Sequence, residues 1–149
     1  MSMRYFEDFA VGDTQDLGEA TVSAAEIVAF GRQFDPQPFH VDEERASASP
    51  FGGLIASGWH TAAIFMRLLV DSLLSSTASM GSPGIDELRW LQPVRPGDTL
   101  RARFTVVEAT PSTRRPDRGT VRSTCEMINQ RGEVVMRVTG INIIGRRPT

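Results

Sequence analysis

Lysine is absent from this sequence of 149 residues, in which all 16 basic residues are arginine. Without lysine the chain cannot form a Schiff base, hold a phosphate in the way of a phosphate-binding loop, or use a serine–lysine pair. The 16 basic residues stand against 18 acidic residues and give a net charge of −2. Such a balance gives no electrostatic basis for binding nucleic acid or an anionic membrane surface.

Cysteine, histidine and long apolar runs are also scarce. Cys125 is the only cysteine, so no disulfide can form within the chain and we expect a cytoplasmic protein. One cysteine and two histidines are too few for a four-ligand zinc set, and we expect neither a metal nor another cofactor. The best apolar run, residues 61–74, is interrupted by Arg67 and Asp71, so we expect no membrane span. The charged N-terminal residues do not resemble a signal or transit peptide.

The length and composition of the chain are those of one folded domain. Hydrophobic residues make up 40% of the chain and charged residues 23%, which is ordinary for a globular protein and unlike a disordered one. A chain of this length can bury a proper core. We therefore expect a single domain over residues 1–149.

The first half of the chain predicts a short strand followed by helices. A capping box at Ser23–Glu26 begins a helix that must end before Pro36. Asp42 is placed to cap a short second helix. A third helix is predicted from about residue 58 to residue 75, and its residues are apolar nearly all round. We expect this helix to be buried inside an element that wraps it.

The second half of the chain predicts antiparallel strands. Apolar and polar residues alternate over 100–107 and 121–127, and a hairpin turn leads into a returning strand over 134–144. Residues 84–91 are a weaker strand candidate, and the polar residues 111–119 are expected to form an exposed loop. Helices followed by a run of strands predict an α+β fold in which a curved antiparallel sheet wraps the long buried helix.

The segment Phe34–His40 is the most unusual local sequence, because it has two prolines in three residues. Prolines stiffen the backbone and favour an extended course. Residues five apart face opposite sides of a straight strand, so Asp35 and His40 converge only if the segment bends. A carboxylate and an imidazole held together can perform acid–base chemistry on water. Alternatively, Asp35 merely ends the first helix and His40 lies on the surface.

A second candidate feature is the glycine-bearing turn that leads into the apolar helix at Gly58. The free backbone N–H groups at a helix start, together with the helix dipole, suit an oxygen that gains negative charge during a reaction. The turn is not a phosphate loop, because the lysine that would follow is missing. The alternative interpretation is that the glycines only allow tight packing at the start of the helix.

Taken together, the two features resemble the signature of a known family. The motif Asp35-Pro36-Gln37-Pro38-Phe39-His40, followed eighteen residues later by Gly58, is similar to that of the MaoC-like acyl dehydratases. These are the R-specific enoyl-CoA hydratases of the hot-dog fold. The turn at Gln92–Leu100 also resembles a turn between strands of this family. The likeness extends over roughly residues 5–144.

The sequence departs from the family pattern at three positions. Gln37 stands where the hydratases usually have asparagine, Phe34 stands where they have glycine, and Ser57 replaces a common histidine. These departures leave hydration chemistry plausible and place the identity of the acyl chain in doubt.

The resemblance implies a hydro-lyase that adds water across the 2,3 double bond of a 2-enoyl thioester and gives an R-3-hydroxyacyl thioester, or runs the reverse reaction. Asp35 and His40 would hold the reacting water and handle its proton. The Gly58 N–H would bond the thioester carbonyl oxygen. Gln37 would orient the water or the His40 ring, and Ser57 and Trp59 would contact the substrate.

The resemblance also implies the partners of the chain. The substrate would be an acyl-CoA thioester, and two chains would pair edge to edge with their active sites at the interface. We therefore expect a homodimer or a higher assembly, and no nucleic-acid or membrane partner.

Two alternatives of other classes stay open. A thioesterase on the same fold usually carries its working carboxylate on or beside the central helix, whereas the only acid here, Asp71, lies far from the start of that helix. A binding module for acyl thioesters without catalysis is allowed by the atypical Gln37 and Phe34. Two further features favour structural interpretations: we expect His60 to be a packed residue, and Arg114, Arg115 and Arg118 to lie in an exposed loop rather than on coenzyme A phosphates.

Overall fold

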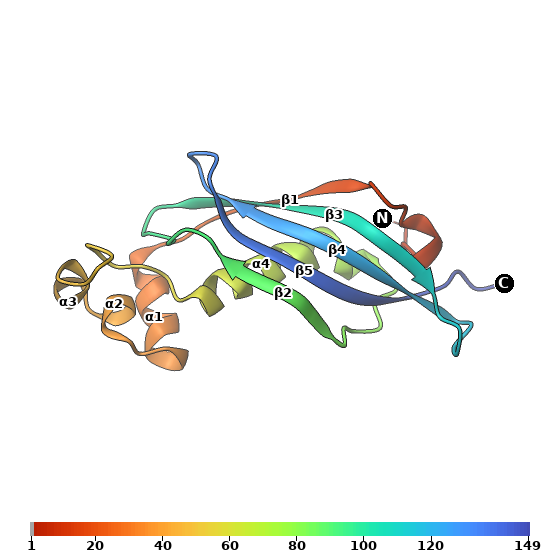
Figure 1. Cartoon of the computed structure of the whole chain (residues 1–149), viewed down its shortest axis with the longest axis horizontal. Helices are drawn as coiled ribbons and strands as arrows, with labels where there is room; N and C mark the ends of the chain where they lie inside the picture. The colour runs from red at the N-terminus through yellow and green to blue at the C-terminus, as the bar shows by residue number, and fades with distance from the viewer. Residues whose placement is uncertain (1) are drawn as a thin grey trace.

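The core of the molecule is a five-stranded antiparallel sheet with one long helix lying across one of its faces (Figure 1). A computed structural model describes residues 2–149. The strand order is β1-β3-β4-β5-β2. In chain order the elements are η1 (Phe6–Asp8), β1 (Thr14–Thr21), α1 (Ala24–Phe34), α2 (Pro38–Val41), α3 (Glu43–Ser47), α4 (Gly58–Ser72), η2 (Leu74–Ser76), β2 (Gly84–Trp90), β3 (Thr99–Pro111), β4 (Arg118–Ile128) and β5 (Val134–Gly145).

Alternating side chains give the sheet one buried face. In β4 every second residue is buried, including Val121, Ser123, Cys125 and Met127, while the alternate residues are partly exposed, as expected for a strand with one face on the core. The strands predicted in the second half of the chain are confirmed, including the weaker candidate that becomes β2. The expected α+β fold is therefore confirmed. Both ends of the predicted loop 111–119 were wrong: Pro111 belongs to β3 and Arg118 begins β4, so the loop is shorter than predicted.

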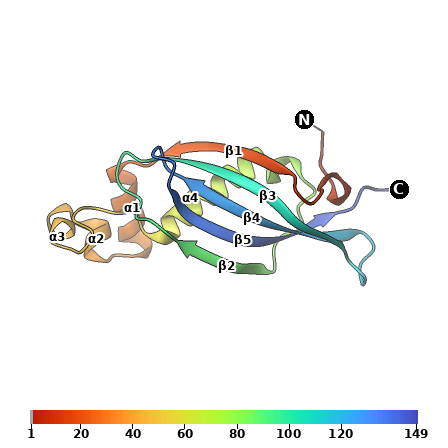
Figure 2. The same ribbon diagram turned by 45° about the horizontal axis from the view of Figure 1, so that its top comes forward.

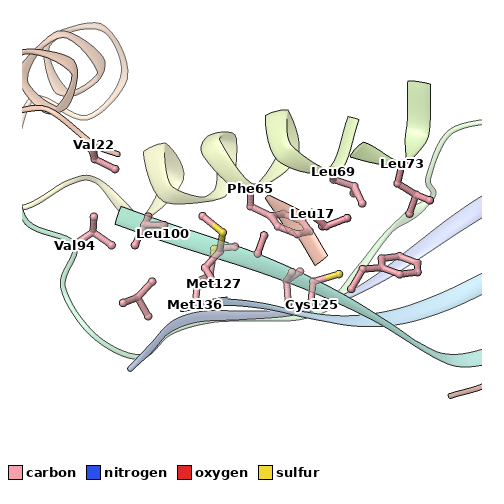
Figure 3. Packing of buried hydrophobic residues seen from close by; sticks show 14 of the residues in the cluster. Leu17, Val22, Phe65, Leu69, Leu73, Val94, Leu100, Cys125, Met127 and Met136 are labelled. Atoms are coloured by element: carbon pink, nitrogen blue, oxygen red, sulfur yellow. The ribbon is translucent and has the colours of Figure 1, made fainter. Parts of the chain in front are cut away.

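Helix α4 packs one face onto this sheet. Phe65 and Leu69 point from the helix toward the strands and meet Leu100, Met127 and other buried side chains there (Figure 3). Leu73 continues the same face just beyond the helix. Burial of these large apolar side chains, each contributing about 1.5–3 kcal/mol relative to exposure, holds the helix against the sheet.

The prediction that the long helix is buried all round was wrong for the single chain. Trp59 is 60% exposed, Met66 48% and Val70 37%, and all three lie on α4. The reason is geometric: the sheet of one chain covers only one side of the helix. The helix also ends at Ser72, a few residues earlier than expected, and the separate turn η2 follows it. None of the helices in residues 2–149 is long and apolar enough to cross a membrane.

The three short helices α1, α2 and α3 gather at one end of the sheet, beside the start of α4 (Figures 1 and 2). The capping box predicted at the start of α1 is confirmed, because the Ser23 hydroxyl accepts from Glu26 N at 3.1 Å and the Glu26 carboxylate accepts from Ser23 N. The Asp42 cap of α3 is confirmed as well. Helix α2 was not predicted, and it sits within the proline-rich segment.

Candidate active site

The proline-rich segment bends and brings Asp35 and His40 together. Helix α1 ends at Phe34, and Gln37 N then donates to Asp35 O at 2.8 Å. Pro38 occupies the first position of α2, where its fixed φ suits a helix start. As a result His40 turns back, and its Nε2 lies 3.2 Å from Asp35 Oδ2. The bend that brings Asp35 and His40 together is therefore the single helical turn of α2.

A close contact between α1 and α2 supports this bend. A Cβ atom on Gly31 would lie 2.9 Å from Val41 Cγ1 and 3.0 Å from His40 Cβ, tighter than ordinary van der Waals contact. A glycine in the last turn of α1 therefore lets the backbone of α2 approach closely. Nothing in the sequence pattern pointed to Gly31 as part of the site.

The orientation of the His40 ring follows from its hydrogen bond. The side chain is buried, and Nδ1 lies 2.7 Å from the carbonyl oxygen of Ile55. Because a carbonyl oxygen only accepts, Nδ1 carries the hydrogen and donates it. Nε2 is consequently the ring nitrogen that faces Asp35 and is left to exchange a proton.

The Asp35 carboxylate receives a donor on each oxygen. Gln37 Nε2 donates to Oδ1 at 2.7 Å, and the Ser57 hydroxyl donates to Oδ2 at 2.8 Å. Burial by itself would raise the pKa of this carboxyl, but the hydrogen bonds from Gln37 and Ser57 and the neighbouring His40 lower the pKa below the ordinary aspartate value. Asp35 is therefore ionised at neutral pH.

Ser57 joins this pair to the start of helix α4. It is the N-cap residue, and its hydroxyl oxygen accepts from Trp59 N at 3.3 Å while its proton goes to Asp35. Gly58 occupies the first helical position, where a backbone N–H has no partner within the helix. One hydroxyl thus fixes the Asp35 carboxylate relative to the positive end of the helix.

Asp35, His40 and Gly58 border one cavity of about 430 Å³. Gln37, Thr61 and Gln92 add further polar groups to its lining. The rest is largely apolar and includes four aromatic side chains, which are Phe39, Phe51, Trp59 and Trp90. An apolar cavity with a few converging polar groups is what a small-molecule site requires.

Trp90 is the cavity residue that the sequence analysis missed most clearly. It ends strand β2, and its Nε1 donates to the carbonyl oxygen of Gly58 at 2.8 Å. A Cβ atom on Gly58 would collide with the indole ring. Gly58 therefore has a packing reason to be glycine, separate from any role of its backbone N–H. No local pattern links positions 58 and 90, since only the fold brings the edge strand to the helix start.

Most of the predicted site residues lie at the cavity, and one does not. Asp35, Gln37, His40, Gly58 and Trp59 all line the cavity. Gln37 also donates to Asp35 rather than to the His40 ring. Ser57 is buried, is not part of the cavity lining and donates to Asp35.

Four other residues singled out from the sequence lie away from the cavity. His60 is buried and stacks on Phe30 at 4.8 Å, and burial lowers its pKa. Asp71 pairs with Arg67 near the far end of α4. Arg114 and Arg115 lie in the β3–β4 loop at the opposite end of the sheet from α1–α3 (Figure 1).

Within residues 2–149 no group of three or more His, Cys, Asp or Glu side chains is arranged to hold a metal ion.

A family model, curated sequences and solved structures all relate this chain to the same group of proteins. The family model described as MaoC like domain matches residues 8–139. The chain is 32% identical over 135 residues to the (R)-specific enoyl-CoA hydratase of Rhodospirillum rubrum, covering 90% of this chain and 87% of the relative. It is also 32% identical over 135 residues to the 3-hydroxybutyryl-CoA dehydratase of Methylorubrum extorquens, covering 90% and 83%.

The solved structures include a MaoC-like dehydratase from Rhodospirillum rubrum. That chain is 52% identical to this one and superposes with a TM-score of 0.87, and the match covers 97% of this chain and 99% of the other.

Proposed function

Because the chain belongs to the MaoC-like dehydratase family, we propose that it adds water to a 2-enoyl-CoA to give an R-3-hydroxyacyl-CoA, and catalyses the reverse dehydration. Relatives named for this hydratase and dehydratase chemistry match most of the chain. The observation that carries the proposal is geometric: Asp35, His40 and the start of α4 at Gly58 border the same cavity.

The Asp35–His40 pair is the proposed acid–base group. The oxygen of water bonds to C3 of the enoyl thioester, and the proton it loses passes to the pair through His40 Nε2, because Nδ1 already donates to Ile55 O. The pair then returns a proton to C2, so that one water molecule is added in full. A positioned proton-transfer group contributes about 10²–10⁴-fold to the rate.

The Gly58 N–H is the proposed donor to the thioester oxygen. As water attacks C3, negative charge gathers on that oxygen and forms an enolate. A fixed backbone donor at the positive end of α4 stabilises this charge without having to reorient during the reaction. Trp59 forms part of the apolar wall for the acyl thioester.

A homodimer is the proposed assembly. Strand β2 lies at one edge of the sheet and pairs only with β5 within the described residues. Unpaired sheet edges favour pairing with another chain. Ile85 on β2 and Met66 and Val70 on α4 are exposed apolar residues, and a second copy of the chain would cover them.

The same geometry favours hydration over a thioesterase and over a binding module without catalysis. A thioesterase needs a working carboxylate by the central helix, yet Asp71 on α4 is paired with Arg67 away from the cavity. A binding module without catalysis would not require Asp35 and His40 to be held 3.2 Å apart. The single buried Cys125 agrees with the proposed cytoplasmic location.

A direct test follows the ultraviolet absorbance of the enoyl thioester after mixing the protein with crotonyl-CoA and with a longer 2-enoyl-CoA. We expect the absorbance to fall without release of free thiol, and chiral analysis to give the R product. Release of thiol would instead favour a thioesterase. Binding of every thioester without turnover would favour the binding module.

A further inference from the structure

The side-chain amide of Gln37 contacts Asp35 and not the His40 ring. Its amide is turned toward Asp35, and Nε2 lies 2.7 Å from Oδ1. An ionised carboxylate only accepts hydrogen bonds, so the amide nitrogen and not the amide oxygen must face it. Gln37 N also donates to the backbone oxygen of Asp35 at 2.8 Å. Both contacts fix Gln37 to the residue two positions before it.

The two donors on Asp35 act on different oxygens. Gln37 holds Oδ1 and Ser57 holds Oδ2, so rotation of the carboxylate about its Cβ–Cγ bond would break both hydrogen bonds. Oδ2 is also the oxygen that lies 3.2 Å from His40 Nε2. The donor on Oδ1 therefore controls, through the rigid carboxylate, where Oδ2 stands relative to the imidazole.

The length of the Gln37 side chain suits this contact. Pro36 separates the two residues, and the backbone turns between them. Asparagine, which the resembling motif carries at this position, has one methylene less between its backbone and its amide. The additional methylene of Gln37 places its amide within hydrogen-bond distance of Asp35 Oδ1.

We propose that Gln37 is a positioning residue for the reaction: with Ser57 it clamps the Asp35 carboxylate in the orientation that keeps Oδ2 beside His40 Nε2. This inference rests on the proposed hydration function. Gln37 acts on the substrate only through Asp35. Its loss should therefore slow the chemical step and leave substrate affinity nearly unchanged.

Two variants separate the amide donor from the size of the side chain. Gln37→Ala removes the donor, and Gln37→Glu keeps the length but places a second carboxylate beside Asp35. Both changes remove a hydrogen bond that favours the ionised form, and Gln37→Glu adds like-charge repulsion. The pKa of Asp35 should rise in both variants, and rise further in Gln37→Glu. Among the described residues, His40 is the charged or titratable side chain within ion-pair distance of Asp35.

The test combines an NMR titration of the Asp35 side-chain carboxyl with steady-state kinetics on a 2-enoyl-CoA. Asp35 is assigned by the signal that disappears in Asp35→Asn. We expect Asp35 to titrate at higher pH in both variants and kcat to fall about tenfold, as for loss of a hydrogen bond to a charged group, with KM little changed. Glu44→Gln on α3, an exposed residue outside the cavity, is the control and should behave as the wild type.

The outcomes distinguish this inference from the proposed function. If Asp35 titrates identically in the wild type and Gln37→Ala, the inference is overturned, whether or not the protein turns over any thioester. If the titration moves but kcat stays at the wild-type value, the positioning role is also overturned. A wild-type protein that hydrates no thioester contradicts the proposed function instead.

Discussion

At the scale of single residues, the site depends on hydrogen bonds that assign a direction to each proton. His40 donates from Nδ1 to Ile55 O, which leaves Nε2 for exchange. Asp35 accepts from two donors and stays ionised. In the proposed mechanism the Asp35 carboxylate would therefore orient the reacting groups and His40 Nε2 would transfer the proton, a division of roles that residue types alone do not reveal.

Removal of the His40 ring should stop proton transfer. We expect His40→Ala to lower kcat by about 10²–10⁴-fold, measured by loss of enoyl-thioester absorbance. His60→Ala is the matched control, because His60 is also buried but lies outside the cavity. Equal losses of rate in the two variants, both still folded by circular dichroism, would contradict the assignment of His40.

Gly58 allows its packing role and its chemical role to be separated. Gly58→Ala should destabilise the protein, because the added Cβ meets the Trp90 ring, and overpacking typically costs about 1–3 kcal/mol. The double variant Gly58→Ala/Trp90→Ala should recover most of that stability, since the obstructing ring is gone.

The backbone N–H of residue 58 survives in every one of these variants. The double variant should therefore hydrate a 2-enoyl-CoA at about the rate of Trp90→Ala alone. Thermal unfolding and kinetics on the four proteins of this cycle measure both effects. A double variant that is stable but far slower than Trp90→Ala would show that glycine itself, and not only the N–H, is required.

At the scale of elements, the start of α4 supports both the fold and the site. Ser57 caps the helix and donates to Asp35. We expect Ser57→Ala to lose about 1 kcal/mol of stability, as for other N-caps, and also to lower kcat. Ser23→Ala is the matched control, because Ser23 caps α1 and its hydroxyl contacts Glu26 rather than Asp35. It should lose similar stability and keep its rate, and a Ser57→Ala protein with unchanged kcat would contradict the dual role.

Some of these elements could be predicted from the sequence and others could not. Capping residues and alternating strands were predictable because their signals are local, as at Ser23–Glu26 and in β4. The turn α2 and the contact of Trp90 with Gly58 were not, because both depend on tertiary packing. The proline-rich segment reads as extended by local preference, and the close approach of α1 at Gly31 accommodates its bend.

At the scale of the whole molecule, the single chain leaves an apolar face open. The sheet covers one side of α4, and Trp59, Met66 and Val70 stay exposed on the helix. Helix α4 also begins at the cavity. This exposed face and the unpaired edge of β2 together favour association of two chains over a monomer in solution.

A charge on this face should disrupt the proposed dimer. We expect Val70→Asp to shift the protein to a monomer in size-exclusion chromatography with light scattering, because an unpaired carboxylate would be buried in the interface. Val107→Asp is the matched control, since Val107 is 42% exposed and Val70 37%, but Val107 lies on β3. A monomeric wild type, or a Val107→Asp protein that dissociates equally, would contradict the proposed interface.

Hydration of an enoyl thioester by the Asp35–His40 pair is tested by comparing three proteins. The rate of crotonyl-CoA hydration is measured for the wild type, for Asp35→Asn and for Asp71→Asn, which removes an exposed carboxylate of α4. We expect Asp35→Asn to lose nearly all activity while remaining folded, and Asp71→Asn to keep the wild-type rate. A folded Asp35→Asn protein that hydrates crotonyl-CoA as fast as the wild type would contradict the proposed role of the pair.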